Sequence, residues 1–413
     1  MKVYKFGGAS VKDAESIRNV AQVLQKVGYS DVCMIISAMG KTTNALEEVV
    51  ALYGEQGDHQ TKINEIKGQH LAIVRDLFDQ PEKIVHLIEN IFSDLEAFLE
   101  RNKSPNYNYI YDQVVCKGEL VSTTIVSEYL NTVGIHNTWL DVREYIKTDD
   151  TYREGQVNWE ETQKAIATLP KDGMIITQGF LGSDANFFTT TLGREGSDYS
   201  AAIFAYCLDA ESMTIWKDVP GVLNADPRYF EDTILLDRIS YEEAIELAYY
   251  GASVIHPKTM QPLQNKNIPF FVKSFYAPLA AGTSVREGQK ISPKTACYIL
   301  KKDQHLLHIS SKDFSFITEE NLSAIFNALY DAKIKVNLMQ NSAISLSICV
   351  EDKYQHLTEL LNQLNHDYKI SHEKGVNLYT IRHYDNDSDQ CLADKKELLR
   401  QTFKETLQIV TKP

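Results

Sequence analysis

An alternation of strand-like and helix-like segments is the feature of this sequence that most restricts its fold. Runs rich in β-branched and aromatic residues take turns with amphipathic stretches through roughly the first 275 residues. This order predicts an α/β domain with a doubly wound, mostly parallel sheet, which binds ligands beyond the carboxyl ends of its strands. The expected strands are Val3–Phe6, Val32–Ser37, Val114–Lys117, Asn137–Leu140, Met174–Phe180, Ser212–Trp216 and Phe270–Lys273, and the expected helices are Ala14–Val27, Leu120–Asn131, Asn158–Thr168 and Ser197–Leu208.

Two regions depart from this alternation. Residues 55–105 hold many helix formers and no clear strand, so we expect a helical insertion within a domain spanning residues 1–285. Residues 286–302 are the expected linker, and a βαββαβ order over residues 303–413 predicts an α+β module of the ferredoxin-like type. Its expected strands are Leu306–Ser310, Lys335–Met339, Ile344–Val350, Tyr368–His372, Leu378–Arg382 and Thr406–Thr411, and its expected helices are Glu319–Ala332, Tyr354–Leu364 and Lys395–Lys404.

Bulk composition limits the classes of partner. The chain has 413 residues and a formal net charge of -14, so neither a nucleic acid nor an anionic membrane is an expected partner. The six cysteines are scattered without metal-ligand spacing, which favours reduced thiols in a cytoplasmic protein and no resident metal site. The sequence shows no signal peptide and no apolar run near the roughly 20 residues that span a membrane.

The segment KFGGAS at residues 5–10 directly follows the first expected strand. Gly7 and Gly8 would let backbone N–H groups approach phosphate oxygens with no Cβ in the way, and Lys5 would place a compact positive charge beside them. Two glycines after a strand also suit a plain tight turn. The segment is neither a Walker loop nor a dinucleotide-binding fingerprint.

The segment TLGREGSDYS at residues 191–200 is more specific for anion binding. Ser197 or Asp198 would cap the helix that follows, and free N–H groups at a helix start favour anions. Arg194 offers a planar fork suited to a carboxylate, and Asp198 is suited to orienting a positive group or a metal. An ordinary capped loop is the alternative.

A third segment, WKDVPGVLNADPR at residues 216–228, joins a strand end to a Pro-Gly turn. Lys217 and Arg228 would meet phosphates or a ribose there, and a surface turn with solvated charges is the alternative.

Together with SAMGKTTN (37–44), KGELVST (117–123) and YYGASVIHP (249–257), these segments resemble the aspartate kinases of the amino-acid kinase family in order and spacing. The resemblance covers nearly the whole chain. It implies a monofunctional aspartokinase that uses ATP and Mg²⁺ to phosphorylate the β-carboxylate of L-aspartate, the first step of lysine, threonine and methionine biosynthesis.

The resemblance also implies a role for particular residues. Lys5 and Asp198 would be catalytic, Lys5 by neutralising the transferring phosphoryl group. Glu119 would bind the α-ammonium of aspartate, Arg194 its α-carboxylate and Thr43 its β-carboxylate. The implied substrate-binding set is Ser37, Ala38, Thr43, Glu119, Arg194 and Ser197, and the implied ATP-binding set is Lys5, Gly7, Gly8, Ser10, Lys217, Asp218, Leu223, Arg228 and Ser253.

Four positions depart from the family pattern. Ala9 stands where threonine is usual, Glu195 where glycine is common, Leu223 where tyrosine is usual and Ser253 where an ATP-binding lysine is frequent. Glu195 adds negative charge beside an anion site, so we expect its side chain to point away. Contacts to the base or ribose would differ from those of the family.

Residues 303–413 resemble the ACT regulatory region of aspartate kinases, with an abbreviated second ACT unit. This implies a homodimer and a feedback effector, lysine or threonine, although Asn337 and Ala343 stand where lysine-sensitive relatives have acidic residues. A module for dimerisation alone is the alternative. The candidate effector residues are Ser310, Asp313, Asn337 and Asn341.

Two other functions remain open from the sequence. One is a kinase of the same fold that acts on another carboxylate or on a nucleoside monophosphate, although Glu119 and Arg194 together favour a free α-amino acid. The other is a catalytically silent amino-acid sensor, which the presence of Lys5, Arg194 and Asp198 disfavours.

Overall fold

The computed structural model describes residues 1–252 and 255–413. The chain divides into two compact units. The first comprises Met1–Val222, Leu235–Ile245 and Val254–Ile291, and the second comprises Leu223–Ile234, Glu246–Ser253 and Ser292–Pro413.

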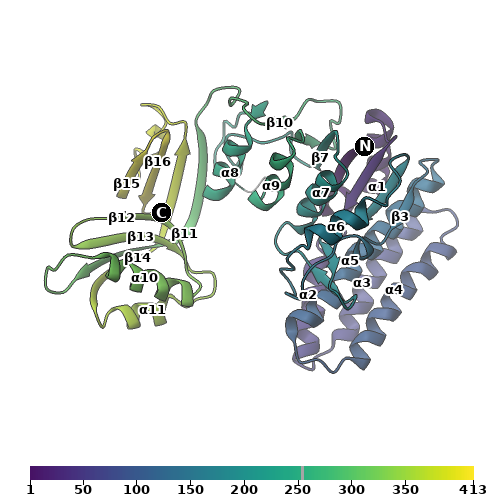
Figure 1. Ribbon diagram of the computed structural model, residues 1–413, viewed down its shortest axis with the longest axis horizontal. Helices are drawn as coiled ribbons and strands as arrows, with labels where there is room; N and C mark the ends of the chain where they lie inside the picture. The colour runs from purple at the N-terminus through teal and green to yellow at the C-terminus, as the bar shows by residue number, and fades with distance from the viewer. Residues whose placement is uncertain (253–254) are drawn as a thin grey trace. The chain divides into compact units, whose positions relative to one another are not determined.

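The first unit is built on an eight-stranded sheet with the strand order β3-β4-β2-β1-β7-β9-β10-β8 (Figure 1). The strands from β3 to β9 are parallel neighbours, and β10 runs antiparallel to β9. The doubly wound, mostly parallel sheet expected from the sequence is therefore confirmed. The strands are β1 (Lys2–Phe6), β2 (Val32–Ile36), β3 (Thr138–Leu140), β4 (Met174–Gln178), β7 (Ser212–Lys217), β8 (Arg238–Ile239), β9 (Phe270–Ser274) and β10 (Thr283–Val285).

Side-chain alternation along β1 assigns each residue to one face of the sheet. Tyr4 and Phe6 belong to the large apolar core that also contains residues of the helical segments between residues 14 and 132. Val3 and Lys5 must then point to the opposite face, because successive strand residues alternate. Helix α7 (Gly196–Cys207) packs against β1, β2 and β7, so Lys5 lies on the side of the sheet that α7 covers.

Helix α1 shows why local sequence predicts some elements well. It spans Ala14–Val27, the range expected from the sequence, and the Asp13 side chain accepts a hydrogen bond from the Ser16 N–H at 2.8 Å. Gly28 follows the helix with a φ of 87°, a conformation that glycine adopts without strain.

The expected strand at Val114–Lys117 is wrong, because these residues lie inside helix α5 (Tyr107–Thr132). The run of Val114, Val115 and Cys116 has strand propensity, but α5 is buried on most sides between α2, α4 and the sheet. A helix that is apolar all round loses the 3.6-residue pattern that would distinguish it from a buried strand.

The insertion expected at 55–105 is helical. It contains α3 (His59–Leu77) and α4 (Glu82–Arg101), which pack with α5 beside α2 (Thr42–Gly54) (Figure 1). Apolar side chains at helical spacing, including Ile63, Ile88 and Phe92, join the main core. The remaining elements of the unit are η1 (Gly8–Val11), η2 (Val142–Glu144), α6 (Trp159–Ile166), the hairpin β5 (Leu181–Ser183) and β6 (Thr189–Thr191), and α9 (Pro257–Asn265). Helix α8 (Tyr241–Tyr250) begins in this unit and ends in the second.

The second unit contains a six-stranded antiparallel sheet with the order β12-β13-β11-β14-β16-β15. Helices α10 (Glu319–Asp331) and α11 (Leu357–Leu364) share an apolar core with the sheet (Figure 1). The strands are β11 (Cys297–Ser311), β12 (Lys335–Asn341), β13 (Ser345–Glu351), β14 (Tyr368–Arg382), β15 (Glu397–Phe403) and β16 (Thr406–Thr411), and η3 spans Gln390–Leu392.

Three expectations for this unit need correction. Strand β11 begins at Cys297, inside the range assigned to the linker, and β14 is one continuous strand where two were expected. The helix expected at Lys395–Lys404 is strand β15, paired with β16 from Glu397↔Thr411 to Phe403↔Thr406. The short sequence ELLRQTF suits either conformation, and hydrogen bonding to the neighbouring strand decides between them.

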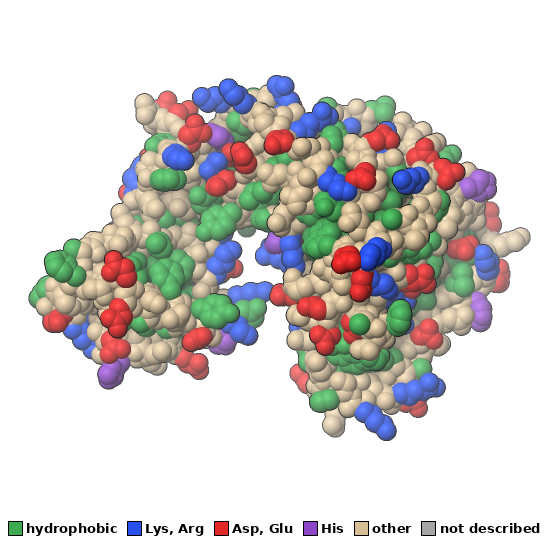
Figure 2. All heavy atoms as spheres, viewed as in Figure 1, with side chains coloured by type: hydrophobic (Ala, Val, Ile, Leu, Met, Phe, Trp, Pro, Cys, Tyr) green, Lys and Arg blue, Asp and Glu red, His purple; other side chains and the backbone are tan. Residues whose placement is uncertain are grey.

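Charged side chains of both signs are interspersed over the face seen in Figure 2, with no extended basic field on that face. No helix within residues 1–252 and 255–413 has the length and apolar character needed to cross a membrane. The six cysteines, all within the described residues, form no disulfide bond, and five of them are buried.

Candidate active site

A buried ion pair lies at the carboxyl end of β1. Lys5 Nζ is 2.6 Å from Asp198 Oδ1, and the two side chains are only 10% and 5% exposed. Lys5 comes from the strand face that α7 covers, and Asp198 comes from the first turn of α7. The fold thus brings together the two residues that the resemblance marks as catalytic.

The glycines after β1 allow two loops to interlock. A Cβ on Gly8 would lie 2.8 Å from the carbonyl oxygens of both Ala38 and Gly40, and Gly8 O accepts a hydrogen bond from Gly40 N–H at 3.1 Å. A Cβ on Gly7 would lie 3.3 Å from Lys5 Nζ. Side chains at either position would therefore crowd the loop or the lysine. Ser10 Oγ is buried and has no hydrogen-bond partner among the described residues.

The loop after β2 carries Ser37 and Ala38, and α5 holds it in place. Ser37 N–H donates to Phe6 O at 3.1 Å, and Ser37 O accepts from Ser122 Oγ at 2.8 Å. Ala38 N–H donates to Glu119 Oε1 at 3.3 Å. Thr43 lies half-buried in the first turn of α2, directly after this loop.

Glu119 is the most perturbed carboxyl group of this site. It is 2% exposed, and its Oε2 atom is buried without a hydrogen-bond partner among the described residues. Burial raises the pKa of Glu119 to about 8. A buried carboxyl group with one free oxygen can accept an ammonium group from a ligand, which would restore its ionised form.

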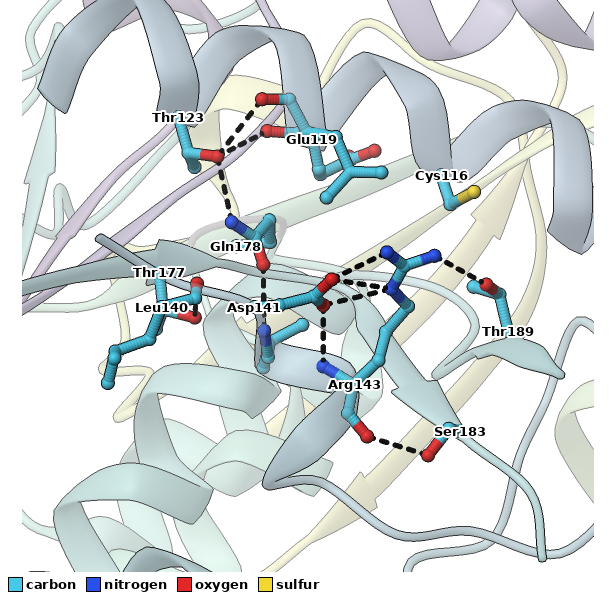
Figure 3. A network of polar contacts seen from close by, with 12 residues as sticks. Cys116, Glu119, Thr123, Leu140, Asp141, Arg143, Thr177, Gln178, Ser183 and Thr189 are labelled. Carbon is cyan, nitrogen blue, oxygen red and sulfur yellow. Dashed lines mark hydrogen bonds and ion pairs between the residues drawn. The ribbon is translucent and has the colours of Figure 1, made fainter. Parts of the chain in front are cut away.

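Glu119 belongs to a polar network that runs along α5 (Figure 3). Thr123 Oγ1 donates to Glu119 O at 2.9 Å and accepts from Gln178 Nε2 at 2.8 Å. Gln178 Oε1 in turn accepts from Val142 N–H at 2.8 Å. Figure 3 shows Arg143 beside Asp141, with its guanidinium also reaching Thr189 Oγ1 at 3.2 Å. These contacts tie α5 to strand β4 and to the hairpin.

The loop before α7 is closely fitted. A Cβ on Gly179 would lie 2.5 Å from Ser197 Cβ, so glycine is needed for Ser197 to occupy its buried position. Arg194 is exposed, which leaves its guanidinium accessible to a ligand.

The expectation that Glu195 points away from the anion site is wrong. Glu195 has a φ of 53° directly before α7, and its Oε2 atom is buried without a hydrogen-bond partner among the described residues. Burial and the charge of Asp198 raise its pKa, against the opposing effect of Lys217, Arg194 and Lys5. The positive charges of Lys217, Arg194 and Lys5 offset the negative charge that Glu195 adds beside the anion site.

The expected nucleotide-binding residues are divided between the units. Lys217 is half-buried at the end of β7, and Asp218 after it is exposed. Leu223 and Arg228 belong to the second unit, where Arg228 Nη2 lies 2.6 Å from Asp226 Oδ2. Ser253 lies outside the described residues.

Sequence reasoning missed a buried acid on α5. Asp112 is fully buried and accepts hydrogen bonds from Arg153 N–H and Thr191 N–H, both at 2.9 Å. An acidic residue close to the apolar run Val114–Cys116 and seven positions before Glu119 is the signal that identifies it, because on a helix this spacing places both acids on one side.

The candidate effector residues do not form one cluster of contacts. Ser310 Oγ donates to Lys369 O at 3.3 Å, and Asp313 Oδ1 accepts from Ser315 N–H at 3.0 Å. Asn341 is exposed at the end of β12. Of the four, only Asp313 lines the cavity of about 310 Å³ in this unit, which is formed by Ser311, Lys312, Asp313, Ser315, Phe316, Ile317, Asn321, Asp367 and Tyr368.

Asn337 is already engaged within the second unit. Its Oδ1 accepts from Lys301 Nζ at 2.8 Å, and its Nδ2 donates to Gln304 Oε1 at 2.7 Å. Burial, followed by the charge of Lys335, lowers the pKa of Lys301 to about 8. The Asn337 amide thus binds Lys301 and Gln304 of its own unit.

The model of the amino acid kinase family matches residues 1–274. The chain is 32% identical over 394 residues to lysine-sensitive aspartokinase 3 of Escherichia coli (strain K12), covering 92% of this chain and 86% of that protein. It is 31% identical over 379 residues to chloroplastic aspartokinase 1 of Arabidopsis thaliana, covering 87% of this chain and 65% of that protein.

Two solved structures of E. coli aspartokinase III are similar to the whole chain at 28% identity, each with a TM-score of 0.83. One is a complex with lysine and aspartate in the T-state, and the match covers 99% of this chain and 95% of that one. The other is a complex with aspartate and ADP in the R-state, and the match covers 100% and 96%.

Proposed function

The chain belongs to the amino acid kinase family and, within it, to the aspartokinases, and from this we propose that it transfers the γ-phosphoryl group of ATP to the β-carboxylate of L-aspartate. The product is 4-phospho-L-aspartate, from which lysine, threonine and methionine are made. The observation that carries the proposal is the buried Lys5–Asp198 pair. Close to it, Gly8 lies against the Ala38 carbonyl, and Ala38 N–H donates to Glu119 Oε1, which leaves Glu119 Oε2 without a partner among the described residues.

The proposed chemistry needs positioning and charge neutralisation more than acid–base catalysis. The β-carboxylate of aspartate is ionised at neutral pH and is already a nucleophile. The difficulty is bringing this anion up to the γ-phosphate. Lys5 neutralises the transferring phosphoryl group, and the N–H groups around Gly7 and Gly8 donate hydrogen bonds to its oxygens. Asp198 Oδ1 lies 2.6 Å from Lys5 Nζ and keeps the ammonium group in position.

The substrate side requires one anion and one cation to recognise an α-amino acid. Glu119 takes the α-ammonium through the Oε2 atom that has no partner within the described chain. The exposed fork of Arg194 takes the α-carboxylate, and Thr43 takes the reacting β-carboxylate. The loop N–H groups and hydroxyls of Ser37, Ala38 and Ser197 complete the set.

The nucleotide side is proposed to use Lys217 and Asp218 at the end of β7. Leu223, Arg228 and Ser253 complete the proposed ATP set, with Gly7, Gly8 and Ser10 at the phosphates. Among the described residues there is no cluster of three or more potential metal ligands. Mg²⁺ binds kinases through one or two carboxylates plus substrate phosphates, and the carboxylates of Asp198 and Glu195 fit that requirement. When bound, the ion neutralises phosphate charge.

The second unit is proposed to regulate the activity. Its ferredoxin-like core supports an ACT-type role in a homodimer, and the relationship to a lysine-sensitive aspartokinase supports lysine as the effector. Threonine is the competing effector. The buried thiols, none of them in a disulfide bond among the described residues, support a reducing compartment, the cytoplasm.

A hydroxamate assay tests the proposed reaction. The purified chain is incubated with ATP, Mg²⁺ and hydroxylamine, which traps an acyl phosphate, with L-aspartate or L-glutamate as acceptor. We expect aspartyl hydroxamate to form and glutamyl hydroxamate to form much more slowly. Preference for glutamate would reassign the substrate, and aspartate binding without any hydroxamate would identify a silent sensor.

A further inference from the structure

Asp112 makes three hydrogen bonds from the interior of α5. Its Oδ2 atom accepts the N–H groups of Arg153 and Thr191, both at 2.9 Å. Its Oδ1 atom accepts the Thr191 hydroxyl at 2.8 Å. Burial raises the pKa of Asp112 to about 6, and these hydrogen bonds oppose that rise. Burying a carboxyl group completely has a desolvation cost, which hydrogen bonds must offset. The hydrogen-bond partners of Asp112 therefore indicate which segments it holds in place.

One partner leads directly to the proposed active site. Thr191 ends strand β6 and is followed by the loop that carries Arg194 and, at the start of α7, Asp198. Thr191 O also accepts the N–H of Gly155 at 2.8 Å. A Cβ on Gly193 would lie 3.3 Å from Arg153 O. The two loops that meet at Asp112 therefore also contact each other.

The other partner leads to α2. Arg153 has a φ of 72°, and its guanidinium lies 2.9 Å from Glu47 Oε1 and 4.1 Å from the ring centroid of Tyr111. Glu47 is four residues after Thr43, so both lie on the same side of α2. Tyr111 and Asp112 are neighbours on α5.

Asp112 thus stands where three substrate-binding elements converge. Glu119 is two helical turns further along the same helix, a rise of about 10.5 Å. We propose that Asp112 is a positioning residue for aspartate binding, which fixes the Arg194 loop and, through Arg153, α2 at a set separation from Glu119. This inference rests on the proposed function. It requires only that Arg194 and Glu119 bind the α-carboxylate and the α-ammonium group of one small substrate at the same time, because misplacement by about 1 Å can then cost a hundredfold in rate.

The test uses two substitutions that keep side-chain volume. Asp112→Asn removes the negative charge and replaces one carboxylate oxygen by an NH₂ group, so the one remaining oxygen cannot accept from all three donors of Arg153 and Thr191. Thr191→Val removes only the hydroxyl bond to Asp112. Asp352→Asn is the matched control, because Asp352 in the second unit also accepts two backbone N–H groups, from His356 at 2.9 Å and Leu357 at 3.0 Å.

Steady-state constants for both substrates and thermal melting are measured on the full chain. In Asp112→Asn we expect the KM for aspartate to rise about tenfold or more, with the KM for ATP changing less than about twofold. In Thr191→Val we expect a rise of about threefold in the same constant. Asp352→Asn should lower Tm without changing the KM for aspartate.

An unchanged aspartate KM in Thr191→Val would overturn the inference, and that variant decides alone if Asp112→Asn does not fold. Equal rises in the KM values of both substrates would also overturn it, since they would indicate general damage to the site. Wild-type chain without aspartyl hydroxamate formation would instead refute the proposed function, so the two failures are distinguishable.

Discussion

Lys5 Nζ lies 2.6 Å from Asp198 Oδ1 in a buried pair that joins the carboxyl end of β1 to the first turn of α7. In the free protein the Asp198 carboxylate neutralises the Lys5 ammonium, which offsets the desolvation cost of burying that charge. An incoming phosphoryl group adds a second acceptor for the same ammonium. Lys5 is therefore held in place before the nucleotide arrives, which is the preorganisation that electrostatic catalysis requires.

Replacing Lys5 tests this arrangement. Lys5→Ala is expected to lower kcat by about a hundredfold or more, because the charge that develops on the phosphoryl group loses its counter-ion. The measurement is steady-state turnover in the hydroxamate assay, with Lys2→Ala on the exposed start of the same strand as control. Turnover of Lys5→Ala close to that of wild type would remove Lys5 from the mechanism.

The pKa of Glu119 predicts how aspartate use depends on pH. Burial raises this pKa to about 8 in the free protein, and only the ionised carboxylate attracts an ammonium group. The kcat/KM for aspartate is therefore expected to fall as pH decreases below about 8. Glu119→Gln should weaken aspartate use and flatten this limb of the profile. An unchanged limb in the variant would assign the titration to another group.

The same pKa has a consequence for stability. Between the ordinary glutamate pKa of 4.5 and the raised value of about 8, the folded state binds more protons at Glu119 than the unfolded state does. Stability from this group is therefore present at low pH and is lost as pH rises through that window. We therefore compare the Tm of Glu119→Gln with the Tm of wild type at two pH values. The variant's Tm minus the wild-type Tm should be higher at pH 9 than at pH 5, on the order of a few degrees. A difference independent of pH would contradict the assignment.

Gly8 is expected to tolerate no side chain. An alanine Cβ would lie 2.8 Å from two backbone carbonyl oxygens, so Gly8→Ala must displace the loop after β2 and reduce activity. Gly68→Ala provides the control, since a Cβ there meets nothing within 4 Å in the interior of α3. The control should gain about 0.5–1 kcal/mol in the free energy of unfolding. Normal activity of Gly8→Ala would show that the two loops separate easily.

Amino-acid titration tests the proposed regulation. Activity measured against rising lysine, threonine and methionine is expected to fall with lysine. The position of Asn337 predicts weak inhibition, because its amide is already bonded to Lys301 and Gln304. Asp367→Asn, in the wall of the 310 Å³ cavity, should change the lysine response without changing the basal rate. No response to any of the three amino acids would refute regulation by the second unit.

Local sequence predicted those elements whose pattern is complete within the segment. Helix α1 carries its apolar stripe, its Asp13 cap and its terminal Gly28 within one stretch, and its limits were predicted without error. The start of α5 and strand β15 were predicted wrongly. In both, the deciding interactions come from elsewhere in the chain, burial between helices for Val114–Lys117 and pairing with β16 for Glu397–Phe403.

For the Lys5–Asp198 pair too, some properties follow from the local sequence and others only from the tertiary structure. The sequence by itself determined that a lysine ends a strand, that an acid begins a helix, and that both lie in segments typical of aspartokinases. Only the tertiary structure decided that they meet at 2.6 Å, that Glu195 is drawn inwards, and that Asp112 joins the loops around them. The reason is physical, since side-chain identity is local, whereas burial and charge separation depend on which distant segments the sheet brings together.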